Sequence, residues 1–157
     1  MEARLDLFNN PFAGKILRHL ASAGAAVKDA GLPESTRELV LLRASQINGC
    51  GFCVDMHTKE ALHAGETGQR LHLVAAWREA TVFTDAERAA LELTEEGTRI
   101  ADGAGGVPAE VWDNAVKYYT EDQLVALVST IAVINAFNRF KVIVQQPAGA
   151  YQVGRKL

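Results

Sequence analysis

The chain is poor in the residues on which several classes of protein depend. It has two cysteines and four prolines in 157 residues, and aromatic residues make up 7% of it. Two cysteines exclude a small scaffold held together by several disulfides. Hydrophobic residues account for 48% and charged residues for 22%, which excludes an intrinsically disordered chain. We therefore expect one domain spanning residues 1–157, with enough apolar side chains for its own core.

Neither sign of charge dominates the sequence. Sixteen Lys and Arg residues face 19 Asp and Glu residues, which gives a net charge of −3. Nucleic acids and acidic membranes bind concentrated basic surfaces, so we predict no nucleic-acid partner and no membrane partner. Residues 1–6 lack the apolar stretch of a signal peptide. The longest apolar run, residues 124–137, is interrupted by polar residues and too short to span a bilayer, so we expect a cytoplasmic protein.

Helix signals follow one another along the chain, whereas strand signals are weak. Asn10-Pro11 is typical of a helix start, and Gly31 of a helix end. The sequences Ser35–Glu38, Thr84–Glu87 and Thr120–Gln123 each have the spacing of a capping box. The sequence therefore predicts an all-α fold of about seven helices, over residues 10–30, 35–48, 50–65, 67–80, 84–100, 108–116 and 120–144.

The two cysteines lie three residues apart, in the segment Cys50-Gly-Phe-Cys53. This spacing sets the sulfurs about one helical turn apart, close enough for a disulfide within a small ring. If a helix begins at Cys50, the free amides and dipoles of its first turn favour a thiolate. His57 follows Cys53 by four residues, so the three side chains project from one face. An imidazole beside Cys53 can take its proton, which activates a cysteine nucleophile.

Glu38 is the nearest upstream carboxylate that could orient the imidazole of His57. A structural role competes with this one, because Glu38 also completes the predicted capping box that starts at Ser35, and spacing alone favours the cap. The cysteines have alternatives too: with His57 and a further ligand they could bind zinc, or they could be buried thiols without a role. A closed zinc site needs four ligands and the chain has no second CxxC, so we predict no metal and no cofactor.

Taken together, these residues resemble a known family. A glutamate twelve residues before a CxxC motif, and a histidine four residues after it, are similar to the AhpD-like branch of the carboxymuconolactone decarboxylase superfamily. The resemblance covers residues 15–145, including the segments Phe83–Arg88 and Ile134–Arg139. It implies an all-helical bundle that assembles into trimers or hexamers, and a thiol peroxidase reduced by an external dithiol, either a protein or a lipoyl-type group.

The resemblance also implies a role for each site residue. Cys53 attacks the peroxide and passes through a sulfenic acid, and Cys50 is the resolving thiol and a proton donor. Glu38 and His57 complete a proton relay. One departure concerns Phe52, since the best-known members have a second histidine between the cysteines. The superfamily's lactone decarboxylases lack the CxxC motif, so Cys50 and Cys53 argue against that reaction.

We therefore predict a thiol-dependent peroxidase that reduces alkyl or hydrogen peroxides through a dithiol–disulfide cycle. Two alternatives stay open. The Phe52 departure favours a CxxC disulfide reductase or redox-sensing adaptor with little peroxidase activity. From a different class, the chain could be a non-catalytic helical assembly protein whose cysteines are structural or bind zinc.

Overall fold

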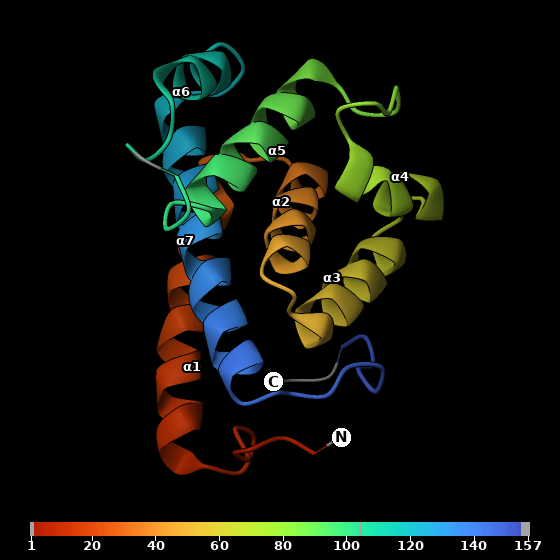
Figure 1. The fold of residues 1–157 in the computed structure, drawn as a ribbon, viewed down its shortest axis with the longest axis vertical. Coiled ribbons are helices and arrows are strands. Elements are labelled where there is room, and N and C mark those ends of the chain that lie inside the picture. The colour runs from red at the N-terminus through yellow and green to blue at the C-terminus, as the bar shows by residue number, and fades with distance from the viewer. Residues whose placement is uncertain (1, 104, 155–157) are drawn as a thin grey trace.

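The computed structural model describes residues 2–103 and 105–154 of the chain. The described residues form seven α-helices and no strand, so the predicted all-α class is confirmed (Figure 1). The helices are α1 (Pro11–Ala25), α2 (Glu34–Ile47), α3 (Gly51–His63), α4 (Gly68–Leu73), α5 (Asp85–Thr98), α6 (Ala109–Val116) and α7 (Glu121–Ile143). Helix α2 lies at the centre, packed between α3, α5 and α7, while α1 runs along the outside of α7.

Two predicted helices are shorter than the sequence indicated. The first was predicted to reach residue 30, but α1 ends at Ala25 and a 3-10 turn, η1 (Lys28–Ala30), follows it. Gly31 then adopts a left-handed backbone with φ 73°, which glycine accepts without steric cost. The segment predicted over residues 67–80 divides into α4 and a second 3-10 turn, η2 (Val74–Ala76).

The three predicted capping boxes have different outcomes. Those at Thr84 and Thr120 are confirmed, because each threonine accepts a backbone hydrogen bond at the start of α5 and α7 and receives the reciprocal bond. The box at Ser35 is wrong. Helix α2 begins at Glu34, with Pro33 as its N-cap, so Ser35 already lies within the first turn. The carboxylate of Glu38 is therefore not used in a cap.

The core lies on both sides of α2. On one side Val40 packs against Leu93 of α5 and Leu127 of α7. On the other side Leu39 and Leu42 pack against residues of α3, α4 and α5. Burying such leucine and valine side chains contributes roughly 1.5–3 kcal/mol each, so α2 is fixed from both faces.

A buried carboxylate joins α5 to the neighbouring segments. Glu95 accepts hydrogen bonds from Arg43 of α2 at 2.7 Å and from the indole of Trp77 at 3.0 Å, and it also pairs with Arg78. Burial opposes ionisation of Glu95, but these donors outweigh it and hold the pKa of the carboxyl below its usual value.

Asparagine side chains fix the turn between α2 and α3. The amide of Asn48, at the end of α2, donates to Asn135 and to Asn138 of α7, each at 2.9 Å. Asn138 donates in turn to the hydroxyl of Ser45 at 3.1 Å. Because this turn leads directly into Cys50, the polar contacts set where α3 begins.

Helix α7 extends at both ends beyond the apolar run of residues 124–137. Within the described part of the chain it is the one helix long and apolar enough to pass a length-and-composition test for a membrane span. The core helix of a globular protein passes the same test, and α7 packs against α1, α2 and α5. Its outer face leaves Val125 and Val128 exposed.

Candidate functional site

The cysteine pair stands at the start of α3. Cys50 is the N-cap residue, and its sulfur accepts a hydrogen bond from the backbone amide of Cys53 at 3.4 Å. The Cα atoms are 5.3 Å apart, and the sulfurs form a disulfide. The pair thus lies where first-turn amides favour negative charge on sulfur once the disulfide is reduced.

Both cysteines are covered almost completely. Cys50 is 1% and Cys53 2% exposed. The ring of Phe52 packs at 6.1 Å from that of Phe8, in the N-terminal segment, and at 6.3 Å from that of Tyr151, in the C-terminal tail. Segments from opposite ends of the chain therefore meet at the ring of Phe52, and Tyr151 packs in one apolar cluster with both cysteines.

The C-terminal tail is tied to α3 by polar contacts. Asp55 accepts hydrogen bonds from the backbone amides of Gly149 at 3.0 Å and Tyr151 at 3.4 Å. Lys59 forms an ion pair with Asp55 and donates to the carbonyl of Tyr151 at 2.9 Å. Partial burial opposes ionisation of Asp55, but the Lys59 and tail donors lower the pKa of this carboxyl.

Glu38 of α2 and His57 of α3 lie in contact across the helix interface. The Nδ1 atom of His57 is 3.2 Å from Oε2 of Glu38, and both side chains are buried. The other oxygen of Glu38 accepts a hydrogen bond from Arg37 at 2.9 Å. Sequence reasoning placed Glu38 near His57 but missed Arg37, which also pairs with the exposed Glu34.

The second ring nitrogen of His57 has no partner. Its Nε2 atom is buried without a hydrogen bond in the described residues, and no hydrogen bond joins the ring to either sulfur of the disulfide. When Nδ1–H donates to Glu38, a neutral imidazole leaves Nε2 unprotonated. The ring can therefore accept a proton on the side away from Glu38.

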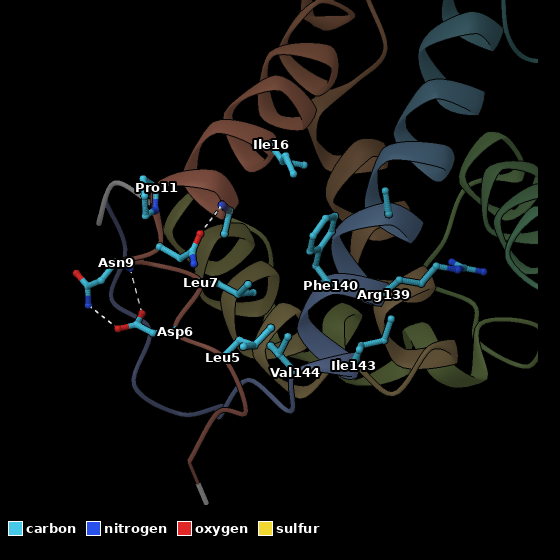
Figure 2. Close-up of a pocket in the computed structure, with 13 residues that line it drawn as sticks. Leu5, Asp6, Leu7, Asn9, Pro11, Ile16, Arg139, Phe140, Ile143 and Val144 are labelled. Atoms are coloured by element: carbon cyan, nitrogen blue, oxygen red, sulfur yellow. Dashed lines mark hydrogen bonds between the residues drawn. The ribbon is translucent and has the colours of Figure 1, made fainter.

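Cys53 and His57 line a cavity of about 300 Å³ between α1, α2, α3 and α7. A larger cavity, about 870 Å³, lies elsewhere, between the N-terminal segment, α1 and the end of α7. Figure 2 shows that apolar residues, among them Leu7, Ile16 and Phe140, surround the larger cavity. It has no cysteine or histidine in its lining, whereas the smaller cavity is lined by two of the predicted site residues, Cys53 and His57.

Sequence reasoning missed a buried cation in the same cavity. Lys141 of α7 lines it and is 5% exposed. Its Nζ atom lies 4.4 Å from the ring centroid of Phe8 and 4.6 Å from that of Phe52. Burial lowers the pKa of Lys141 to about 8. A lysine near the end of an exposed helix usually extends into water, so the sequence carried no signal for this position.

Metal binding was one of the alternatives left open by the sequence. Within residues 2–103 and 105–154, no group of three or more His, Cys, Asp or Glu side chains is placed to hold a metal ion. The cavity is lined by the sulfur-bearing Cys53, by His57, which contacts Glu38, and by the ammonium group of Lys141.

The fold and the site together describe an all-helical protein with a buried CxxC pair and an adjacent Glu–His pair. The chain belongs to the carboxymuconolactone decarboxylase family, whose model matches residues 14–96. That segment contains Glu38, Cys50, Cys53 and His57, so the resemblance inferred from the sequence is confirmed at family level.

Relatives and solved structures agree with this assignment. The uncharacterised protein YdfG of Bacillus subtilis is 43% identical over 115 residues, which are 73% of this chain and 77% of that one. A protein of unknown function from Agrobacterium tumefaciens, whose description proposes an AhpD antioxidant defence protein, is 33% identical. It superposes with a TM-score of 0.85, covering 96% of this chain and 100% of that one. The debrominase Bmp8 shares the fold, with a TM-score of 0.78 at 19% identity over 92% of this chain and 75% of its own.

Proposed function

We propose that the protein is a thiol-dependent peroxidase in which Cys53 is the nucleophile, Cys50 the resolving thiol, and Glu38 and His57 a proton relay. The observation that supports this most directly is the cysteine pair at a helix start, of which Cys53 lines the same cavity as an imidazole that contacts a buried carboxylate. Each part supplies one requirement of the reaction: a stabilised thiolate, a base and an orienting group.

The reaction cycle has three steps. The Cys53 thiolate attacks the terminal oxygen of R–O–OH, so that an S–O bond forms, the O–O bond breaks, and the alkoxide leaves as an alcohol after taking a proton. The Cys50 thiolate then attacks the sulfenic sulfur of Cys53, forming the disulfide and releasing hydroxide, which is protonated to water. An external dithiol returns two electrons and is itself oxidised to a disulfide. The disulfide state described above is the oxidised state of this cycle.

The proton relay follows from the Glu38–His57 contact. Glu38 holds Nδ1, so Nε2 is the nitrogen available to take a proton from a cysteine thiol and return it to the leaving alkoxide. Reduction of the disulfide frees both sulfurs to move. The protonated thiol of Cys53 can then approach Nε2 of His57 and transfer its proton.

Burial of the sulfurs favours small substrates over protein partners. A protein disulfide must bring its sulfur in line with the attacking thiolate, but Cys50 and Cys53 are nearly inaccessible behind Phe52, Phe8 and Tyr151. The cavity of about 300 Å³ that Cys53 lines has room for a peroxide or a small lipoyl-type dithiol. The alternative, a disulfide reductase or redox adaptor, requires the tail to move.

The test compares wild-type protein with Cys53→Ser and Cys50→Ser in peroxide turnover driven by a dithiol. We expect Cys53→Ser to fall to the background rate. Cys50→Ser should react once and leave a sulfenic acid that dimedone labels. Insulin reduction in parallel measures the disulfide-reductase alternative. Full peroxide consumption by Cys53→Ser, or insulin reduction without peroxide turnover, would contradict the proposal.

We also propose that the protein acts as a homo-oligomer, a trimer or hexamer, in the cytoplasm. Exposed apolar side chains on the outer face of α7 and on α1, including Val125, Val128 and Phe12, support an interface between copies. A cytoplasmic location suits the cycle, since that compartment maintains reduced dithiols. Light scattering at micromolar concentration checks the assembly, and a monomer there would contradict it.

A further inference from the structure

The cavity beside Cys53 combines an apolar wall with charge of one sign. Its larger apolar side chains come from α2, α3 and α7 and are those of Leu41, Phe52, Met56, Val133, Ile134 and Phe137, while α1 contributes small residues. A volume of about 300 Å³ lies at the lower end for small-molecule pockets. The space therefore suits a compact ligand with an apolar body rather than hydrogen peroxide alone.

The charged lining of the cavity is entirely cationic in the described residues. Apart from His57, its ionisable side chains are Lys28, Arg37 and Lys141, and no carboxylate lines it. Arg37 is neutralised by Glu34 and Glu38, and Lys28 is exposed to solvent at the rim. Lys141 is thus the cation that the protein leaves uncompensated inside.

The environment of Lys141 is unusual for a lysine. Of the described side chains, no carboxylate lies within ion-pair distance of its Nζ, and its close neighbours are the rings of Phe8 and Phe52. Two cation–π contacts offset part of the cost of burial but provide no negative charge. Even with its pKa lowered to about 8, most Lys141 side chains are protonated at pH 7. An anion entering the cavity would supply the missing partner.

His57 gives a second, independent sign of a ligand. It is 8% exposed and lines the cavity, and its Nε2 has no hydrogen-bond partner. A buried polar atom without a partner is costly, and a bound ligand with a donor or acceptor removes that cost. A hydroperoxyl group can donate to Nε2 beside Cys53.

We propose that this cavity binds an organic hydroperoxide whose apolar body carries a carboxylate, with Lys141 as the counter-ion of that carboxylate and the hydroperoxyl group held between Cys53 and His57. This inference rests on the proposed peroxidase function and adds its substrate class. The reaction at sulfur is the one described above. The product is the corresponding hydroxy acid, and the external dithiol supplies the electrons.

Two probes of nearly the same shape test the proposal in turnover. Cumene hydroperoxide is neutral, and its para-carboxylate derivative carries one negative charge. We measure kcat/KM for each at pH 7 with dithiothreitol as reductant, in wild type, Lys141→Met, Lys141→Arg and Lys117→Met, the last an exposed lysine remote from the cavity. We expect wild type to prefer the carboxylate by about tenfold or more. That preference should disappear in Lys141→Met, return in part in Lys141→Arg, and persist in Lys117→Met.

A binding measurement separates this inference from the proposed function. In the Cys53→Ser protein, 4-isopropylbenzoate and its neutral amide are compared by calorimetry, with and without Lys141→Met. Tighter binding of the carboxylate that depends on Lys141, together with a wild-type protein that consumes neither hydroperoxide, would support the cavity inference and remove the peroxidase function. Peroxide turnover with equal kcat/KM for both hydroperoxides, or an equal loss for both in Lys141→Met, would overturn the substrate inference and leave the peroxidase function standing.

Discussion

The Nδ1 atom of His57 lies 3.2 Å from Oε2 of Glu38, although the two residues stand 19 positions apart on different helices. The contact exists because α2 begins one residue before Ser35, which removes Glu38 from the cap that its spacing indicated. One helix boundary thus determines whether this carboxylate serves the backbone or the imidazole.

Glu38→Gln is expected to lower peroxide kcat/KM by about a hundredfold, because the amide neither holds the Nδ1 proton as strongly nor stabilises an imidazolium. Steady-state turnover across pH 5–9 measures this. Glu34→Gln is the matched control, since Glu34 pairs with the same Arg37 but lies outside the buried contact. Equal losses in the two variants would show that Arg37, rather than His57, is the partner that matters.

Asp55→Ala is expected to raise the alkylation rate of the reduced cysteines about fivefold. Losing the tail contacts destabilises the position of the C-terminal tail against α3 by about 1 kcal/mol. Asp55 anchors the tail through the amides of Gly149 and Tyr151. Iodoacetamide labelling followed by mass spectrometry measures the rate. Asp113→Ala, an exposed position on α6, serves as the control, and an unchanged rate in Asp55→Ala would mean that the tail does not limit access.

Lys141→Met is expected to raise the free energy of unfolding at pH 7 by on the order of 1 kcal/mol, because the wild type buries an ammonium that has no carboxylate partner. The folded pKa of about 8 lies below that of the unfolded chain, so the penalty is complete below pH 8. It is relieved as pH rises toward 10.5.

Wild-type stability should therefore rise relative to Lys141→Met when pH increases from 7 to 9.5, as measured by urea unfolding of the oxidised proteins. Lys117→Met supplies the control for loss of a surface charge. A parallel pH dependence in wild type and Lys141→Met would contradict the burial of a charged lysine.

Glu95→Gln is expected to lower the free energy of unfolding by about 3 kcal/mol, since it leaves the partly buried Arg43 without its carboxylate. The pKa of Glu95 is held below its usual value, so its contribution is present above the unfolded pKa and is lost as pH falls through the folded one. Urea unfolding at pH 7 and pH 3 measures both effects. In Glu96→Gln, which changes the neighbouring carboxylate, the loss should be small, and an equal loss there would exclude a special role for Glu95.

Local signals predicted most of the fold. The threonine caps of α5 and α7 depend on side chains within three residues of the helix start, and both are confirmed. The failures came where a second signal competed with the one that the prediction used, either nearby in the sequence or through tertiary packing. Pro33 rather than Ser35 precedes α2, and the chain after Ala25 turns to bring η1 onto α7 instead of continuing the helix.

The candidate site divides in the same way. Cys50, Cys53 and His57 are near one another in sequence, and helical periodicity alone placed them on one face. Lys141 was invisible because its environment is made by Phe8 and Phe52, which reach it only through tertiary packing. Nothing in the neighbourhood of residue 141 distinguishes it from a solvated lysine at the end of a helix.

The buried Lys141 and its partner Phe8 lie outside residues 14–96, the part that matches the family model, whereas Glu38, Cys50, Cys53 and His57 all lie inside it. The groups proposed to break the peroxide bond and the cation proposed to bind the carboxylate of the substrate are therefore carried by separate stretches of the chain. Exchanging the N-terminal segment and the end of α7 between family members should redirect substrate choice while the electron-transfer steps at sulfur continue. The part of the chain that is proposed to bind the carboxylate could then vary between family members while the cysteine site stays the same.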